Sequence, residues 1–294
     1  MQSLSRGWGF LKQAWQMAMA DKDLIKPSVY ALIAGFIVTL ICVIPIGVIS
    51  FLLNGTKVGT AIIYIMGAIL IFIQYMVGYI FSAMTVYLIY GYLAEGDGRM
   101  DKAWAIVKRD LWDIASLAVA STAVNLLQSA VRGKGRSGGR NLLAGLIETV
   151  WTEAAFLILP AMVIEDINLK DGIKRATQII KNNLLLVGIS TVGVKTITGI
   201  AGFLLGAVGV ALGFGVGLGI VSASQGSVAG LITGVTLGIL IATPFILFAT
   251  VITTYTATAY HTCLYLWARD VERSRQAGET KEVTAPSPLA AVLP

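Results

Sequence analysis

The sequence predicts an all-α, polytopic membrane protein of about six transmembrane helices, arranged as three hairpins that each follow an amphipathic interfacial helix. Hydrophobic residues make up 56% of the 294 residues and charged residues only 13%, whereas soluble domains average about 25% charged residues. Several apolar runs reach the roughly 20 residues that a helix needs to cross a bilayer. A polar, amphipathic segment precedes each pair of these runs.

Residues 1–26 are predicted to form an amphipathic helix in the lipid headgroup layer. Within "LSRGWGFLKQAWQMA", Leu4, Trp8, Leu11 and Trp15 recur at helical spacing, as expected for a helix that lies in the interface. The first long apolar run begins only at Pro27, which argues against a cleavable signal peptide. We therefore expect the first apolar run to be a retained anchor.

Residues 27–267 are predicted to form a single transmembrane helical domain. The expected spans are 27–53, 58–93, 111–131, 142–164, 184–221 and 228–267. The third span is the weakest because Asp113, Asn125 and Gln128 interrupt it, and a buried or re-entrant helix is the alternative. Residues 268–294 are polar and are expected to form a partly disordered cytoplasmic tail.

The distribution of lysine and arginine predicts the orientation. With both termini in the cytoplasm, sixteen of these residues fall in cytoplasmic segments and five in outer ones, which follows the positive-inside rule. The outer loop "RGKGRSGGR", residues 132–140, is the exception. The net charge of +6 is explained by these flanking residues, so no nucleic-acid partner is expected.

Two further amphipathic segments precede the second and third hairpins. They are "RMDKAWAIVKRDLW" at 99–112 and "NLKDGIKRATQIIKNN" at 168–183. In the second, Asn168 and Asp171 suggest an N-cap, and Leu169, Ile173, Ala176 and Ile180 form the apolar stripe. The pattern of interfacial helix, span and span occurs three times, which indicates either a threefold pseudo-repeat or ordinary connectors at the bilayer surface.

Four segments carry a resemblance to a known family: "WGFLKQAWQMAMADKDLIKPSV", "YLAEGDGRMDKAWAIVKRDLWDI", "WTEAAFLILPAMVIEDINLKDGIKRATQIIKNN" and "TTYTATAYHTCLYLWARD". Over about residues 5–270 the chain resembles an uncharacterised prokaryotic integral-membrane family. It is also distantly similar to the membrane domain associated with glycerophosphodiester phosphodiesterases. The resemblance implies a multi-pass protein of the prokaryotic cytoplasmic membrane. The chain departs from the family pattern at Glu153 and Ala176.

Regularly spaced glycines predict close helix packing in the last hairpin. Glycines four residues apart share one helix face and let two backbones approach closely in lipid. The predicted packing or oligomer face consists of Gly202, Gly206, Gly209, Gly213, Gly226, Gly230, Gly234 and Gly238. This face either closes the hairpin on itself or joins it to another subunit, and a pore lining is a third interpretation.

A carboxylate in an apolar span marks the candidate polar site. Glu153 lies inside "WTEAAFLILPAMVIED", and a charge there costs on the order of 3 kcal/mol on insertion scales. Lys195 is the expected partner, with Asn125 and Gln128 on the neighbouring span. Glu153 is then either a protonatable or cation-binding group on a transport path, or a structural group paired with a lysine, a hydroxyl or an indole.

The remaining polar residues suggest no catalytic site. His261 lies among tyrosines and is expected at the interfacial aromatic belt. Cys42 and Cys263 have no metal-binding spacing, and we expect no cofactor. The first hypothesis is a non-enzymatic, homo-oligomeric, structural or lipid-organising membrane protein in contact with membrane lipids. The alternatives are a small transporter or channel with Glu153 on the path, and a membrane module accessory to a separate enzyme.

Overall fold

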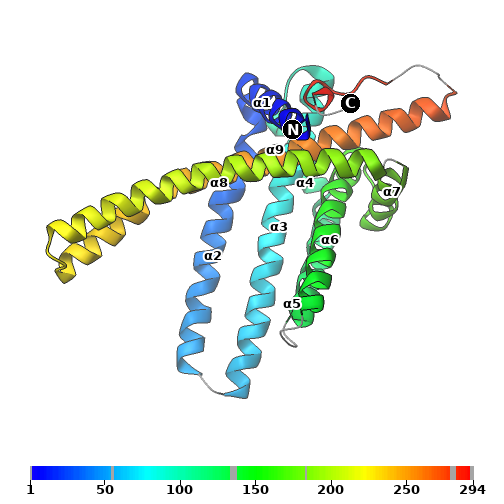
Figure 1. The fold of residues 1–294 in the computed structure, drawn as a ribbon. Helices are drawn as coiled ribbons and strands as arrows, with labels where there is room; N and C mark the ends of the chain where they lie inside the picture. The colour runs from blue at the N-terminus through cyan, green and yellow to red at the C-terminus, as the bar shows by residue number, and fades with distance from the viewer. Residues whose placement is uncertain (1, 54–55, 133–137, 183, 279–282, 292–294) are drawn as a thin grey trace. The chain divides into compact units, whose positions relative to one another are not determined.

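A computed structural model describes residues 2–53, 56–132, 138–182, 184–278 and 283–291 (Figure 1). The side chains of 2–4, 138–140, 184–193 and 195 are outside this description. The chain divides into two compact units. Unit 1 comprises Met1–Gln16, Leu185–Tyr260 and Ser287–Pro294, and unit 2 comprises Met17–Leu184 and His261–Pro286.

Helices account for the regular structure throughout the described ranges. They are α1 (Gln2–Ala20), the 3-10 helix η1 (Lys22–Leu24), α2 (Lys26–Leu52), α3 (Lys57–Glu95), α4 (Met100–Arg109), α5 (Leu111–Arg132), α6 (Gly138–Glu165), α7 (Leu169–Asn182), α8 (Leu184–Ala223), α9 (Val228–Gln276) and α10 (Ser287–Ala290). Six of them, α2, α3, α5, α6, α8 and α9, are long and apolar enough to cross a membrane. The predicted all-α, polytopic fold class is confirmed.

The C-terminal region differs from the predicted tail. Helix α9 continues to Gln276 instead of ending at residue 267, and a short helix, α10, follows. Arg269 has only 8% of its surface exposed, and its guanidinium lies 5.8 Å from the centre of the Tyr90 ring. Leu289 of α10 is fully buried. The buried side chains make contacts that order the C-terminal region, and the local amino-acid composition does not reveal these contacts.

Unit 2 is built around the α2–α3 and α5–α6 hairpins. Helix α3 contacts α2, α5 and α6, and α7 packs against α6 and α5. Hydrogen bonds join the two helices of the first hairpin. Nε2 of Gln74 on α3 donates to the Gly35 carbonyl of α2 at 2.9 Å and to Oγ1 of Thr39 at 2.7 Å. Such bonds fix the relative register of helices that cannot gain stability from hydrophobic burial in lipid.

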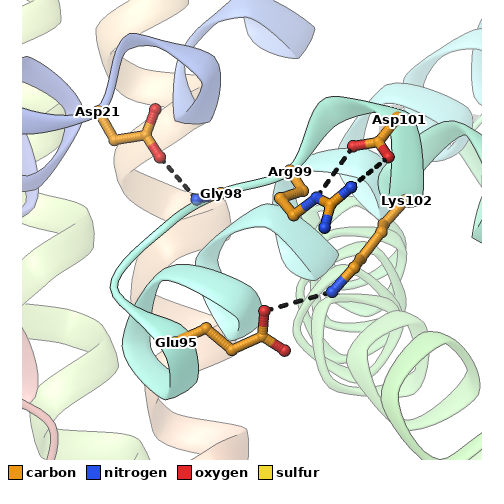
Figure 2. A network of polar contacts seen from close by, with 6 residues as sticks. All are labelled: Asp21, Glu95, Gly98, Arg99, Asp101 and Lys102. Carbon is orange, nitrogen blue, oxygen red and sulfur yellow. Dashed lines mark hydrogen bonds and ion pairs between the residues drawn. The ribbon is translucent and has the colours of Figure 1, made fainter.

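The loop between α3 and α4 is held by Asp21 (Figure 2). Gly98 N–H donates to the Asp21 carboxylate at 2.7 Å. Helix α3 is capped at its C-terminus by Gly96, whose φ of +79° is readily adopted by glycine. Nearby, Arg99 donates to Asp101 at 2.9 Å, and this hydrogen bond lowers the pKa of the Asp101 carboxyl. The hydrogen bond between Asp21 and Gly98 therefore links the segment before α2 to the segment after α3, at the two ends of the α2–α3 hairpin.

Helix α1 buries its apolar face on α9 within unit 1. The rings of Phe10 and Tyr260 meet edge to face at 5.4 Å, and the Tyr255 hydroxyl donates to the Ala14 carbonyl at 3.2 Å. Phe10 and Ala14 are fully buried, whereas Trp8 is 59% exposed. The buried face of α1 is therefore not centred on the predicted stripe. Which residues are buried depends on which of them contact α9.

The other two amphipathic helices also pack on protein. In α4, Ala103 and Val107 are buried, whereas Trp104 is 41% exposed. In α7, Gly172, Ala176 and Ile179 are buried, whereas the predicted Ile173 is exposed. The backbone N–H of Asp171 donates to Oδ1 of Asn168 at 3.0 Å, which confirms the predicted N-cap.

Candidate intramembrane polar site

The Glu153 carboxylate pairs with an imidazole. Oε2 of Glu153 on α6 lies 3.0 Å from Nε2 of His261 on α9, and the side chains are 24% and 7% exposed. The Phe156 ring stacks on the imidazole, with ring centres 4.5 Å apart and an interplanar angle of 10°. Glu153 and Phe156 are three residues apart and so share one face of α6. This face fixes the imidazole by a hydrogen bond and by stacking.

The sequence did not predict the contact between Glu153 and His261. His261 was expected at an aromatic belt, and the structure adds that its side chain is buried against Phe156 of α6. The side chain of Lys195, the expected partner of Glu153, lies outside the described residues. Both Glu153 and His261 take part in further interactions besides their mutual one. The one feature of the sequence that could have drawn attention to His261 is that it is the single histidine of the chain.

A second polar cluster joins three helices of unit 2. Oγ of Ser121 on α5 lies 2.7 Å from the Tyr79 hydroxyl on α3 and accepts a hydrogen bond from Nε1 of Trp151 on α6 at 2.9 Å. Ser121 is fully buried. These residues were not identified from the sequence, because serine and tyrosine are common in apolar spans. Trp151 begins the stretch that also contains Glu153.

Asn125 lies at a pocket, apart from the predicted group. The pocket has a volume of about 540 Å³ and lies between α2, α3 and α5, where Thr39, Gln74 and Tyr75 also line it. Gln128 is buried and does not line this pocket. Of the four predicted polar residues, Asn125 therefore belongs to the α2–α3–α5 pocket and Glu153 to the contact between α6 and α9.

Glu148, the second acidic residue of α6, pairs near the end of the α5–α6 hairpin. Its Oε2 accepts a hydrogen bond from Arg132 at 2.6 Å, and both side chains are about half exposed. An exposed pair of this kind contributes at most about 1 kcal/mol, so Glu148 offers a natural comparison for Glu153.

Arg175 of α7 connects two other helices of unit 2. It binds Glu165 of α6 at 3.2 Å and also Glu272 of α9. Burial disfavours the charge of Arg175, but Glu272 and Glu165 outweigh this effect and raise the pKa of Arg175 above its ordinary value. Helix α7 is therefore held to α6 and α9 by charge as well as by its apolar face.

The glycines of the last hairpin pack against each other within one chain. A β-carbon at Gly213 would overlap the Gly238 carbonyl oxygen, and one at Gly217 would lie 2.9 Å from the Gly234 carbonyl oxygen. Real β-carbons essentially never approach closer than 3.0 Å. Of the three interpretations that the sequence left open, the structure contains the first, the hairpin closed on itself.

The remaining predicted glycines have different surroundings. A β-carbon would meet Phe245 at Gly209 and Thr253 at Gly202, whereas at Gly206 nothing lies within 4 Å. Gly226 has a φ of +73° in the turn, and a β-carbon at Gly230 would overlap Ser224 in that turn. Helix contact thus explains part of the predicted face, and turn geometry explains another part.

Comparison with known proteins adds no relative. No family model, no curated protein and no solved structure matches the chain. The resemblance to an uncharacterised membrane family therefore stays a prediction from the sequence.

Proposed function

We propose that the protein is a small transporter of the prokaryotic cytoplasmic membrane in which the Glu153–His261 pair exchanges protons during transport. The observation that carries this proposal is the 3.0 Å contact between the carboxylate and the imidazole, on helices that are long and apolar enough to cross a membrane. Ionisable residues within such helices are costly, and they commonly mark ion pathways and proton relays. The lysine and arginine distribution supports cytoplasmic termini.

The chemistry of the pair suits proton exchange. An imidazole nitrogen and a carboxylate oxygen at hydrogen-bond distance can hold a proton on either group, and histidine is the side chain that most readily changes charge near neutral pH. Phe156, stacked on the ring, keeps the imidazole in place through either state. Transfer therefore needs no large movement of either helix.

A separate cluster of polar groups in unit 2 is a further candidate for proton exchange. Trp151, which lies two residues before Glu153 and on a different face of α6, donates to Ser121, which in turn contacts Tyr79. Hydroxyl groups both donate and accept hydrogen bonds, so the Ser121 cluster suits the same role.

The proposal predicts that Glu153→Gln abolishes proton flux. The purified protein is reconstituted in liposomes that contain a pH-sensitive dye, and a potassium diffusion potential drives proton movement. We expect Glu153→Gln and His261→Asn to reduce the flux to that of protein-free liposomes, because neither replacement can take up a proton. Glu148→Gln is the matched control and should retain the flux. Wild-type flux in Glu153→Gln, with folding unchanged, would exclude this role of the pair.

A scaffold or lipid-organising role is the second candidate, and one surface favours it. Helices α8 and α9 expose large apolar side chains, among them Phe203, Phe214 and Ile232, each at least 60% exposed. The contacting glycines are already used inside the hairpin. A homo-oligomer that forms through this hairpin would therefore use the exposed apolar side chains.

The scaffold candidate predicts a lipid-retaining homo-oligomer that depends on Phe214. Native mass spectrometry of the protein extracted with minimal detergent should give a mass that is a multiple of 31.2 kDa. Phe214→Asn should shift this mass to the monomer, because it places an amide in an apolar interface. Phe36→Asn, at an exposed position of α2, is the control. A monomeric wild-type protein would refute the scaffold candidate.

A further inference from the structure

The pocket between α2, α3 and α5 is an open groove that carries hydrogen-bonding groups, and its polar lining residues are partly exposed. Its volume of about 540 Å³ falls in the range of small-molecule sites. Polar groups come from all three helices: Thr39 from α2, Gln74 and Tyr75 from α3, and Asn125 from α5. Among the described residues that line it, none carries a charged side chain.

Two of these residues hold each other in place. Gln74 uses its amide N–H groups for the Gly35 carbonyl and for Oγ1 of Thr39, and Thr39 donates to the same carbonyl at 2.8 Å. The Gln74 amide is thereby oriented, and its Oε1 is left as an acceptor. A β-carbon at Gly35 would lie 3.2 Å from this oxygen, so glycine leaves space beside it.

The other two residues provide donors as well as acceptors. Within the described part of the chain, the Asn125 amide and the Tyr75 hydroxyl make no side-chain hydrogen bond. The amide has two N–H donors and one acceptor oxygen, and the hydroxyl can both donate and accept a hydrogen bond. The pocket therefore offers an occupant donors from Asn125 and Tyr75 and an acceptor from Gln74.

The position of the pocket restricts the chemistry of its occupant. Thr39 is the central residue of the 27-residue helix α2, and Gln74 lies close to the midpoint of the 39-residue helix α3. At 1.5 Å per residue, both lie about 20 Å or more from either helix end. Charged lipid headgroups stay at the interface, and an amide without a partner is costly in hydrocarbon. An uncharged occupant with hydrogen-bonding oxygens fits this position.

We propose that this pocket binds a neutral glycerolipid of the diacylglycerol class, whose free hydroxyl and ester carbonyls match the donors and acceptors of Asn125, Tyr75 and Gln74. The acyl chains of such a lipid contact Leu70 and Ile71, which also line the pocket. This site goes beyond proton exchange at Glu153 and stands independently of it.

Photo-crosslinking tests the site. The probe is a diacylglycerol with a diazirine on one acyl chain, added to the full-length protein in phosphatidylcholine nanodiscs and mapped by peptide mass spectrometry. We expect adducts on α2, α3 and α5 that unlabelled dioleoylglycerol displaces and added dioleoylphosphatidylcholine does not. Asn125→Leu should reduce these adducts to the level seen without irradiation.

Asn141→Leu supplies the matched control. It makes the same substitution at an exposed position of α6, outside the pocket, and should leave the adducts unchanged. Circular dichroism and gel filtration test whether Asn125→Leu is folded. If that variant is unfolded, the displacement of the wild-type adducts by dioleoylglycerol tests the proposal instead. Equal displacement by phosphatidylcholine, or adducts that persist in a folded Asn125→Leu, would overturn the proposal. Proton flux through the same variants is a separate readout, so the two proposals can fail independently.

Discussion

Gly213→Leu is expected to lower the free energy of unfolding by about 2 kcal/mol. A β-carbon at this position overlaps the Gly238 carbonyl oxygen, and a backbone atom cannot rotate away as a side chain can. Overpacking costs about 1–3 kcal/mol or more, whereas replacing glycine within a helix recovers about 1 kcal/mol. The steric loss wins because α8 and α9 must separate along several contacts. Unfolding by sodium dodecyl sulfate in mixed micelles, followed by circular dichroism, measures the change.

Gly215→Leu is the control for this prediction. It lies two residues away on the same helix, and nothing is found within 4 Å of a β-carbon there. It keeps the gain in helix propensity without the overlap, so its stability should equal or exceed that of the wild type. Equal stabilities of the Gly213 and Gly215 variants would show that the close contact does not hold the hairpin.

His261→Leu is expected to cost about 2 kcal/mol of unfolding free energy. Removing one partner of a buried ionisable pair leaves the other poorly solvated, which costs about 3–5 kcal/mol for full burial. The 24% exposure of Glu153 reduces that figure. The same titration with sodium dodecyl sulfate measures the loss, at a pH near neutrality.

A double-mutant cycle isolates the pair from its surroundings. Glu153 and His261 each take part in other interactions, so neither single variant reports on the pair alone. We expect Glu153→Leu combined with His261→Leu to cost less than the sum of the two, with a coupling energy of about 1–2 kcal/mol. Strict additivity would mean that the 3.0 Å contact contributes nothing to stability.

The spans were predictable from the sequence because each is a local property of composition. The run from Pro27 to Leu53 reads directly as α2, and even the weak third span appears as the helix Leu111–Arg132. The end of α9 was not predictable, since residues 268–276 owe their order partly to contacts of Arg269 with Tyr90 and of Glu272 with Arg175. These partners are far away in the sequence.

The candidate site was predictable only in part. Glu153 stands out in any reading of the sequence, because a carboxylate in an apolar run is costly. Its contact with His261 did not stand out, since His261 is 108 residues away and helical periodicity relates residues only within one helix. For the same reason the α2–α3–α5 pocket, which joins Thr39, Gln74 and Asn125, could not be seen beforehand.

The sequence by itself determined that this is an all-α, multi-pass membrane protein, where its spans lie, and which residues are out of place in them. Hydropathy and helical period act over a few turns, so they need no knowledge of the rest of the chain. The tertiary structure decided that Glu153 meets His261 and that Gly213 and Gly217 face Gly238 and Gly234 in the same chain. These contacts depend on how separate helices pack, which no local pattern specifies.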